Sequence, residues 1–349
     1  MTELQSNQVT NGQVTNHEEA PWFEDFTVGD DFSIVPSVTI TEGFAAIHQA
    51  IFGDRLRLPL DHHLSKRVTS DRLVNPSLLC NLAIGQSTFP SQRVMGNLFY
   101  RGLIIHKPVF LGDTIQTKTK VVALRQNSLK PGRAASGMVA LEMHVTNQKD
   151  ETVMLFWRCP MIPCKDKEAS TGHLDSFDFM PAVVEMDILE KAIPSWKTDE
   201  YKKGLPGIHF KDLEAGNKFD CEARDTITLA PELVRLTLNM AMTHTDAQRS
   251  VYGKRLVYGG HTISMAAAQI SRVLPNMLTI LGWFTCDHIA PVFEEDILRS
   301  HVRIQDTHSL DKGGIVTLHV ESFVTRINFG EDEAEEIKVL DWVLAVLFA

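Results

Sequence analysis

The chain of 349 residues has no long uninterrupted hydrophobic run. The longest candidate, residues 339–349, is far shorter than the roughly 18 residues that a membrane helix needs, and Asp341 interrupts it. The first 20 residues are polar and lack the hydrophobic core of a signal peptide. These absences argue against a membrane span and predict a cytoplasmic protein with a disordered tail over residues 1–20.

The chain contains few cysteines, and its acidic residues outnumber its basic residues. The five cysteines are odd in number and form no CxxC pair, which argues against a disulfide framework or a zinc site. Lys and Arg number 34 against 44 Asp and Glu, so the net charge of −10 argues against a general affinity for nucleic acid. A GxGxxG fingerprint and a metal-ligand cluster of usable spacing are also absent, so we expect no metal, flavin or nicotinamide cofactor.

An internal repeat organises the chain. Residues 23–32 return at residues 210–219, an offset of 187, with matching aromatic, Asp and Gly positions. Residues 107–114 match residues 290–297 at an offset of 183. A further match near the two ends has an offset of 185. Matches in the same order at nearly constant offset predict two copies of one domain.

The repeat sets the domain boundaries. The first domain is expected over residues 21–164 and the second over residues 206–349. Between them, residues 165–205 are of mixed polarity and contain several Pro and Gly, as expected of a linker. A short helix is predicted in this linker over residues 184–193.

Both copies predict the same order of elements. A strand over residues 32–40 leads to a helix that begins after Thr41, and a strand over residues 219–229 leads to a helix that begins at Pro231. Proline at the first helical turn removes no hydrogen bond that the helix needs. Each copy therefore starts with a strand followed by a helix.

A second helix and a set of strands complete each copy. Residues 78–84 and 263–270 are apolar nearly all round, which predicts buried helices that open at Asn75-Pro76 and at Gly259. Alternating strands follow, for example over residues 115–122 and 316–321. One buried helix wrapped by an antiparallel sheet, twice over, is an α+β architecture.

Three strings in the sequence carry a resemblance to a known family. They are Asp-Phe-Thr-Val-Gly at residues 25–29, Pro-Val-Phe-Leu-Gly-Asp-Thr at 108–114, and Arg-Leu-Val-Tyr-Gly-Gly-His-Thr-Ile-Ser at 255–264. With them the chain resembles the MaoC-type acyl dehydratases that carry two fused hot-dog domains. The resemblance implies a tandem hot-dog fold and a hydro-lyase that reversibly hydrates an α,β-unsaturated acyl-CoA. It implies most closely the conversion of mesaconyl-CoA to β-methylmalyl-CoA.

The family motif has an Asp five positions before a His. In the second copy these positions hold Asn239 and His244, so the resemblance implies that His244 is the acid/base. Asn239 can hold a water but cannot take its proton as a carboxylate would. Asp246 is a candidate to orient the imidazole. In the first copy Asp54 occupies the Asp position but Pro59 replaces the His, which implies a scaffold domain, with Asp54 a candidate to serve the site from across the two domains.

The long helix of the second copy opens at Gly259-Gly260-His261. The first N–H groups of a helix have no partner within it and carry the positive end of its dipole. A thioester oxygen placed there would be stabilised as it becomes an enolate. The resemblance implies that the N–H of Gly260 or His261 donates to that oxygen.

The sequence leaves alternative functions open. Asn239 and the missing His of the first copy favour a catalytically inactive protein that binds acyl-CoA or serves as a partner subunit, whereas His244 favours an enzyme. A thioesterase would need a carboxylate on the long helix, and residues 263–270 have none. The sequence does not determine the acyl group, for which itaconyl-CoA and crotonyl-CoA are alternatives. It also does not determine whether the protein forms a homo-oligomer. Candidates to hold the phosphates of coenzyme A, which the sequence does not rank, are Lys66, Arg67, Arg72, Lys254 and Arg255.

Overall fold

The structure is a computed structural model that describes residues 19–326 and 335–349. Nearly all of the tail expected over residues 1–20 lies outside the described residues. The described strands form an 11-stranded sheet in the order β1-β3-β4-β5-β2-β8-β11-β10-β9-β6, and β7 pairs with β9. The strands are β1 (Val38–Thr39), β2 (Gly96–Ile105), β3 (Thr114–Gln126), β4 (Ser136–Asn147), β5 (Thr152–Pro163), β6 (Lys218–Asp220), β7 (Asp225–Thr226), β8 (Met277–His288), β9 (Ile297–Ser309), β10 (Gly314–Arg326) and β11 (Glu335–Phe348).

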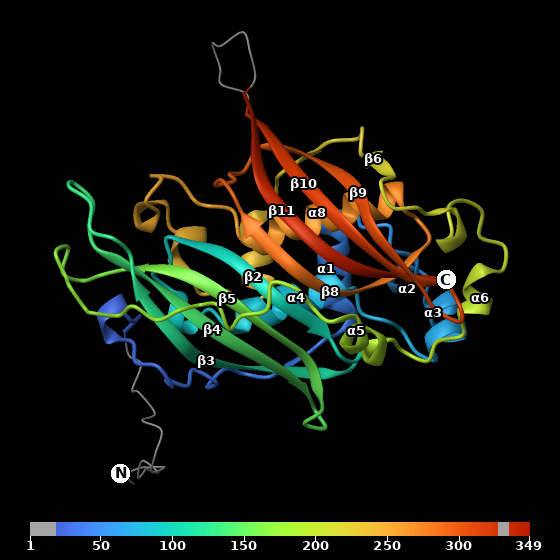
Figure 1. Ribbon diagram of the computed structural model, residues 1–349, viewed down its shortest axis with the longest axis horizontal. Helices are drawn as coiled ribbons and strands as arrows, with labels where there is room; N and C mark the ends of the chain where they lie inside the picture. The colour runs from blue at the N-terminus through green and yellow to red at the C-terminus, as the bar shows by residue number, and fades with distance from the viewer. Residues whose placement is uncertain (1–18, 327–334) are drawn as a thin grey trace.

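Antiparallel pairing of β2 with β8 makes one sheet of the two halves, which lie side by side in Figure 1. Tyr100 is opposite Cys286 and Ile104 is opposite Gly282 in this pairing. A Cβ atom on Gly282 would lie 2.3 Å from the carbonyl oxygen of Leu103, so the two strands approach closely only because this residue is glycine.

The buried helices α4 (Pro76–Gln86) and α8 (Gly259–Val273) lie against one face of the sheet (Figure 1). Every residue of α4 is buried, as expected for a helix without a polar face. The Asn75 side chain accepts a hydrogen bond from Ser77 N at 2.8 Å and caps the start of α4. The helices are α1 (Glu42–Phe52), α2 (Arg57–Leu60), α3 (His62–Thr69), α4 (Pro76–Gln86), α5 (Met186–Ala192), α6 (Thr198–Lys202), α7 (Ala230–Leu236) and α8 (Gly259–Val273).

The repeated sequence motifs form matching turns. Phe23–Asp25 and Phe210–Asp212 are both single 3₁₀ turns, and the Asp of each accepts a hydrogen bond from the backbone three residues before it. Likewise Asp113 accepts from Phe110 N at 2.8 Å, and Asp296 from Phe293 N at 2.9 Å. The same short-range hydrogen bonds therefore explain why these strings recur in both copies.

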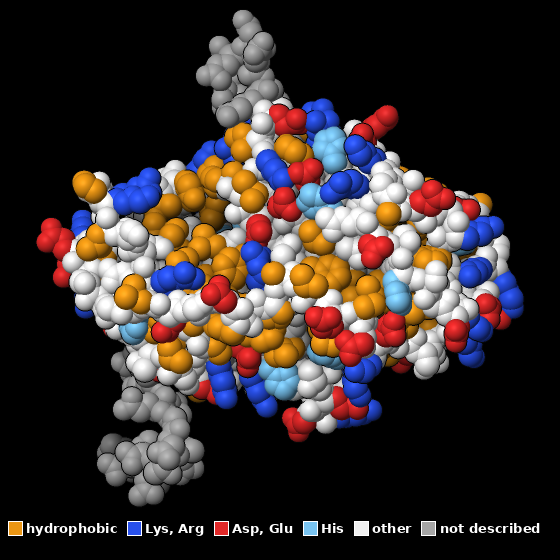
Figure 2. Space-filling view, viewed as in Figure 1, with side chains coloured by type: hydrophobic (Ala, Val, Ile, Leu, Met, Phe, Trp, Pro, Cys, Tyr) orange, Lys and Arg blue, Asp and Glu red, His pale blue; other side chains and the backbone are white. Residues whose placement is uncertain are grey.

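The segment between the copies packs on the outer face of the sheet, where Figure 1 shows it crossing the strands of the first half. Phe177 and Met180 pack against Ala140 and Cys159 of that sheet. Further on, Leu189 and Tyr201 join a second apolar cluster with residues of both halves. On the face seen in Figure 2, Lys and Arg side chains gather at the end that carries α6.

Two expected strands are much shorter than predicted. Of residues 32–40 only β1 is a strand, and of residues 219–229 only β6 and β7. Both segments run along an edge of the sheet, where only one neighbour is available for hydrogen bonds. Pro36, which lacks an N–H donor, lies within the first of them.

The expected helix starts are confirmed. The first helix begins at Glu42 after Thr41, and α7 has Pro231 in its first turn. Among the described residues no helix combines the length and the hydrophobicity that crossing a membrane requires.

Candidate active site

A cavity of about 220 Å³ lies between the two halves. It is below the range of about 300–1,000 Å³ that is typical of pockets enclosing a whole drug-sized ligand. Its wall combines the start of α8, the segment after α7, the end of β8 and parts of β2 and β5. The polar side chains in this wall include Arg158, Asn239, His244, Tyr258 and His288.

His244 ends a 3₁₀ turn, Met242–His244, and is buried at 9% exposure. Its Nδ1 lies 2.8 Å from the carbonyl oxygen of Leu256. Since a carbonyl can only accept, Nδ1 carries the hydrogen of a neutral ring and Nε2 keeps its lone pair. Burial lowers the pKa of His244 to about 4, so the ring is neutral near pH 7 and its Nε2 can accept a proton.

Asn239 lies in the wall of the same cavity, so the structure brings the two motif residues together. Its Oδ1 accepts a hydrogen bond from Ala241 N at 2.9 Å, which leaves the amide Nδ2 to donate. The first half holds this loop in place, because Thr88 Oγ1 accepts from Met240 N and Gln92 O accepts from Met242 N, both at 2.8 Å.

His288, the last residue of β8, is a site residue that the sequence analysis missed. Its Nε2 is buried without a hydrogen-bond partner among the described residues, and a Cβ on Gly259 would lie 2.5 Å from it. Burial and, to a smaller extent, the nearby His244 lower the pKa of His288 to about 4. In the first copy the same repeat position, 183 residues earlier, holds Ile105. A histidine where the other copy has isoleucine is the signal that could have found it.

The start of α8 reaches the cavity through Gly259. The expected donor His261 does not fit that role, because its N–H already donates to Tyr258 O at 2.8 Å. Its ring faces α1, with Nε2 2.8 Å from Thr228 O and the ring centroid 4.9 Å from that of Phe52. Gly260 remains as an expected donor, although its side of the helix packs closely against Asn81.

Two carboxylates proposed to support the site are engaged elsewhere. Asp246 accepts a hydrogen bond from Gln248 N at 2.9 Å, so the carbonyl of Leu256, and not this carboxylate, orients His244. Asp54 is buried at 3% exposure and is not in the cavity wall. It accepts from Ser271 Oγ at 2.6 Å and from Asn75 Nδ2 at 2.7 Å, as a fully bonded structural residue.

The equivalent place in the first half is a pit of only about 20 Å³. The linker residues Ala192, Pro194 and Trp196 form part of its wall. Apart from Thr279 the rest of the wall is apolar, and at an offset of 183 its residues Pro76, Leu79 and Ile105 match Gly259, Thr262 and His288 of the cavity. The first half therefore has neither the room nor the polar groups of the second.

The five basic residues considered as candidates to bind the phosphates of coenzyme A lie in two different places in the structure. Lys254 and Arg255 directly precede Leu256 in the cavity wall. Lys254 Nζ lies 3.7 Å from the centroid of the Phe293 ring, and Arg255 pairs with Glu294 at 2.6 Å. The other three, Lys66, Arg67 and Arg72, lie in or just after α3 and are not in the wall.

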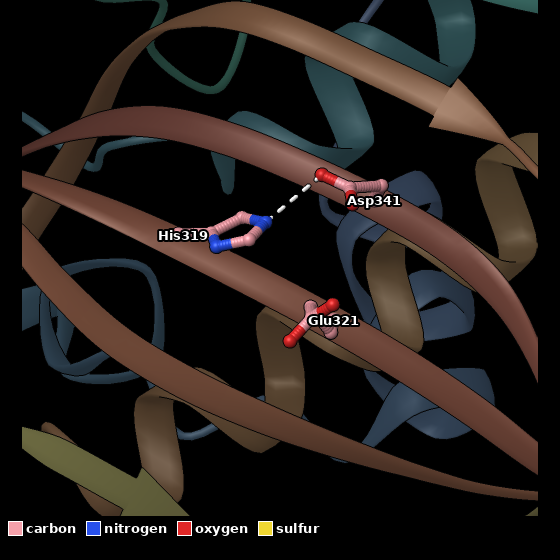
Figure 3. Close-up of side chains that lie close together, drawn as sticks. All are labelled: His319, Glu321 and Asp341. Atoms are coloured by element: carbon pink, nitrogen blue, oxygen red, sulfur yellow. Dashed lines mark hydrogen bonds and ion pairs between the residues drawn. The ribbon is translucent and has the colours of Figure 1, made fainter.

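His319, Glu321 and Asp341 form the one group among the described residues whose ligand atoms are spaced for a metal ion (Figure 3). They project from β10 and β11, and His319 Nε2 lies 2.9 Å from Asp341 Oδ1. Lys338 Nζ bonds to both carboxylates, at 2.7 Å in the case of Asp341. Because an ammonium group already binds both carboxylates, we interpret this group as an ion-pair network.

Comparison with known proteins gives relatives over most of the chain, although no family model matches it. The chain is 30% identical to beta-methylmalyl-CoA dehydratase of Chloroflexus aurantiacus, over 79% of the chain and 80% of that protein. It is 26% identical to mesaconyl-CoA hydratase of Cereibacter sphaeroides, over 89% of the chain and 93% of that protein.

Solved structures extend the likeness to the fold. A conserved hypothetical protein of Mycobacterium tuberculosis with a double hot-dog fold is 40% identical, with a TM-score of 0.86 over 94% of this chain and 98% of that one. A protein described as a MaoC domain dehydratase, from Chloroflexus aurantiacus, is 26% identical, with a TM-score of 0.81 over 94% and 97% of the two chains. The expected tandem hot-dog fold is confirmed, and the chain belongs to the MaoC-like dehydratase family in its double hot-dog form, as a hydro-lyase.

Proposed function

We propose that this protein reversibly adds water to the double bond of a short α,β-unsaturated acyl-CoA, converting mesaconyl-CoA to β-methylmalyl-CoA. The observation that carries the proposal is that His244, whose Nδ1 is bonded to the carbonyl of Leu256, shares a cavity with Asn239 and with the start of α8. The names of the two relatives at 30% and 26% identity support the class of substrate.

The reaction begins with a water held between Asn239 and His244. His244 Nε2 takes a proton from the water as its oxygen bonds to the β-carbon of the substrate. The electron pair of the double bond moves into the thioester, whose oxygen becomes an enolate. The hydrogen bond from Nδ1 to the carbonyl of Leu256 stabilises the imidazolium that forms, because a hydrogen bond is stronger when its donor is charged.

The enolate lies at the start of α8 in this mechanism. Gly259 and Gly260 are the first residues of the helix, so their N–H groups have no acceptor one turn earlier within it. These donors and the helix dipole stabilise the negative oxygen. A proton then returns to the α-carbon, which completes the addition of H and OH.

His288 supplies a second neutral imidazole beside Gly259. The imidazolium of His244 holds the proton that the α-carbon must receive, and Asn239 cannot relay it. We assign His288 to this relay: its Nε2 accepts the proton from His244 and passes it to the α-carbon, so that both rings end neutral. The chain itself then supplies every acid and base of the reaction, so no metal, flavin or nicotinamide takes part.

The test is a panel of enoyl-CoA thioesters with the purified protein, followed by the loss of enoyl-thioester absorbance. We expect the highest kcat/KM with mesaconyl-CoA, lower values with itaconyl-CoA and crotonyl-CoA, and unchanged rates in EDTA. Tight binding of acyl-CoA without hydration of any member of the panel would instead establish an inactive acyl-CoA-binding protein.

A further inference from the structure

Among the residues that the structure describes, Arg158 is the one formally charged side chain in the wall of the cavity. The described part of the wall contains no Asp, Glu or Lys, and its other polar groups are amides, hydroxyls and imidazoles. Arginine stays protonated in proteins, so the cavity carries a positive charge at one place in its wall.

The first half holds this guanidinium rigidly. Arg158 lies on β5 and is buried at 2% exposure. Its Nη2 donates to Ser87 O at 2.6 Å and to Ser91 Oγ at 2.8 Å, just beyond the end of α4. Its Nε is buried with no hydrogen-bond partner among the described residues. The group is therefore oriented, yet part of its donor capacity is unused.

Within the described residues Arg158 has no carboxylate partner, unlike three less deeply buried arginines. Arg101 pairs with Asp287, Arg272 with Asp225 and Arg326 with Asp296. A buried charge is unfavourable unless an opposite charge and hydrogen bonds compensate it. A buried arginine at a cavity wall without such a partner suits a ligand that brings the negative charge.

The position of Arg158 relative to His244 fits a short acyl group. Tyr258 lies beside His244, with ring centroids 5.7 Å apart, and lines the same cavity as Arg158. Both residues face one cavity of about 220 Å³. A ligand whose thioester lies at the start of α8 can therefore extend its other end toward Arg158.

We infer that Arg158 binds the free carboxylate of a dicarboxylic acyl-CoA, so that the half without a reaction site selects the substrate for the other half. The inference rests on the proposed function and names the residue that recognises the carboxylate of its substrate. A guanidinium offers two parallel N–H donors to a carboxylate. The phosphates of coenzyme A are a less suitable source of this charge, because the pantetheine arm separates them from the thioester.

The first experiment uses the unmodified protein and two saturated, unreactive analogues of equal chain length, succinyl-CoA and butyryl-CoA. We expect succinyl-CoA to bind at least about tenfold more tightly in calorimetry, since a hydrogen bond to a charged group contributes that much. Equal affinities would overturn the inference. The comparison needs no turnover, so it remains decisive even if the protein hydrates no enoyl-CoA and the proposed function fails.

The second experiment compares kcat/KM for mesaconyl-CoA and for uncharged crotonyl-CoA in Arg158→Met, Arg158→Lys and the matched control Arg101→Met. We expect Arg158→Met to lower the value about 100-fold for mesaconyl-CoA and less than about threefold for crotonyl-CoA. Arg158→Lys should restore part of the loss, and Arg101→Met should leave the ratio unchanged.

An equal loss with both substrates would mean that Arg158 acts on the thioester or on the fold, which overturns the inference and leaves the proposed function standing. If Arg158→Met does not fold, Ser91→Ala takes its place, since it removes one hydrogen bond to the guanidinium. We then expect a smaller loss that is again confined to mesaconyl-CoA, and an unchanged ratio would count against the inference.

Discussion

Asn81 donates a hydrogen bond from Nδ2 to Ser264 Oγ at 2.7 Å, and the two residues stand 183 positions apart. That separation is the repeat offset, so equivalent positions of α4 and α8 meet each other at the centre of the molecule. The active cavity and the closed pit are related by the same local symmetry. Each difference between them, such as His288 against Ile105, can therefore be tested as a difference in function.

His244→Ala should remove the acid/base group. We expect kcat to fall by about 100- to 10,000-fold, the range that general acid–base catalysis contributes. The affinity for butyryl-CoA, measured by calorimetry, should change little because Asn239 and the start of α8 remain. Near-normal turnover of this variant, with normal folding, would show that His244 is not the base.

His288→Ile places the residue of the first copy into the second. We expect kcat to fall by about 100-fold if His288 transfers a proton. The thermal midpoint should stay equal or rise, because the variant removes a buried nitrogen that has no hydrogen-bond partner. A lower midpoint with unchanged kcat would point to a structural role instead.

Asp54→Asn should affect stability and not turnover. The substitution places an amide donor among Leu56 N, Ser271 Oγ and Asn75 Nδ2, which all donate to the carboxylate. Losing a buried hydrogen bond costs about 1–3 kcal/mol, so urea denaturation should give a lower free energy of unfolding by this amount. A large loss of kcat in protein that is still folded would place the reaction in the first half.

Stability should fall in mild acid because of the buried histidines. The folded-state pKa is about 4 for His244, His261 and His288, below the ordinary value of 6.5. The unfolded chain therefore binds more protons than the folded one between these values, and stability present above about pH 6.5 is lost as the pH falls toward 4. Urea denaturation from pH 7 to 4.5 should show this loss, and it should be shallower in His244→Gln. An identical slope in that variant would contradict the neutral buried state of His244.

Lys254→Ala should weaken the binding of coenzyme A phosphates. Lys254 is exposed and lies two positions before Leu256 of the cavity wall, where the long arm of the thioester would leave the protein. We expect KM to rise by a few-fold, more strongly at low salt, with kcat unchanged. Lys66→Ala, on α3, is the matched control and should leave KM unchanged. Equal effects of the two variants on KM would contradict a specific role of Lys254 in binding the phosphates.

The sequence by itself determined the repeat, the two buried helices with their starts at Asn75-Pro76 and Gly259, and the motif pair of Asn239 and His244. These features are local or periodic, because a helix cap, a turn and an apolar face depend on residues close together in the chain. The edge strands were overestimated, since alternation does not report how many neighbours a strand has.

Only the tertiary structure decided which side chains meet at the cavity. Arg158 and His288 come from β5 and β8, far along the chain from the motif, and they converge because the sheet is continuous across both halves. His261 and Asp54, close to the motifs in sequence, are directed into other hydrogen bonds. Linker residues, Trp196 among them, form part of the wall of the pit in the first half. Such contacts depend on the packing of distant segments, which local sequence patterns do not encode.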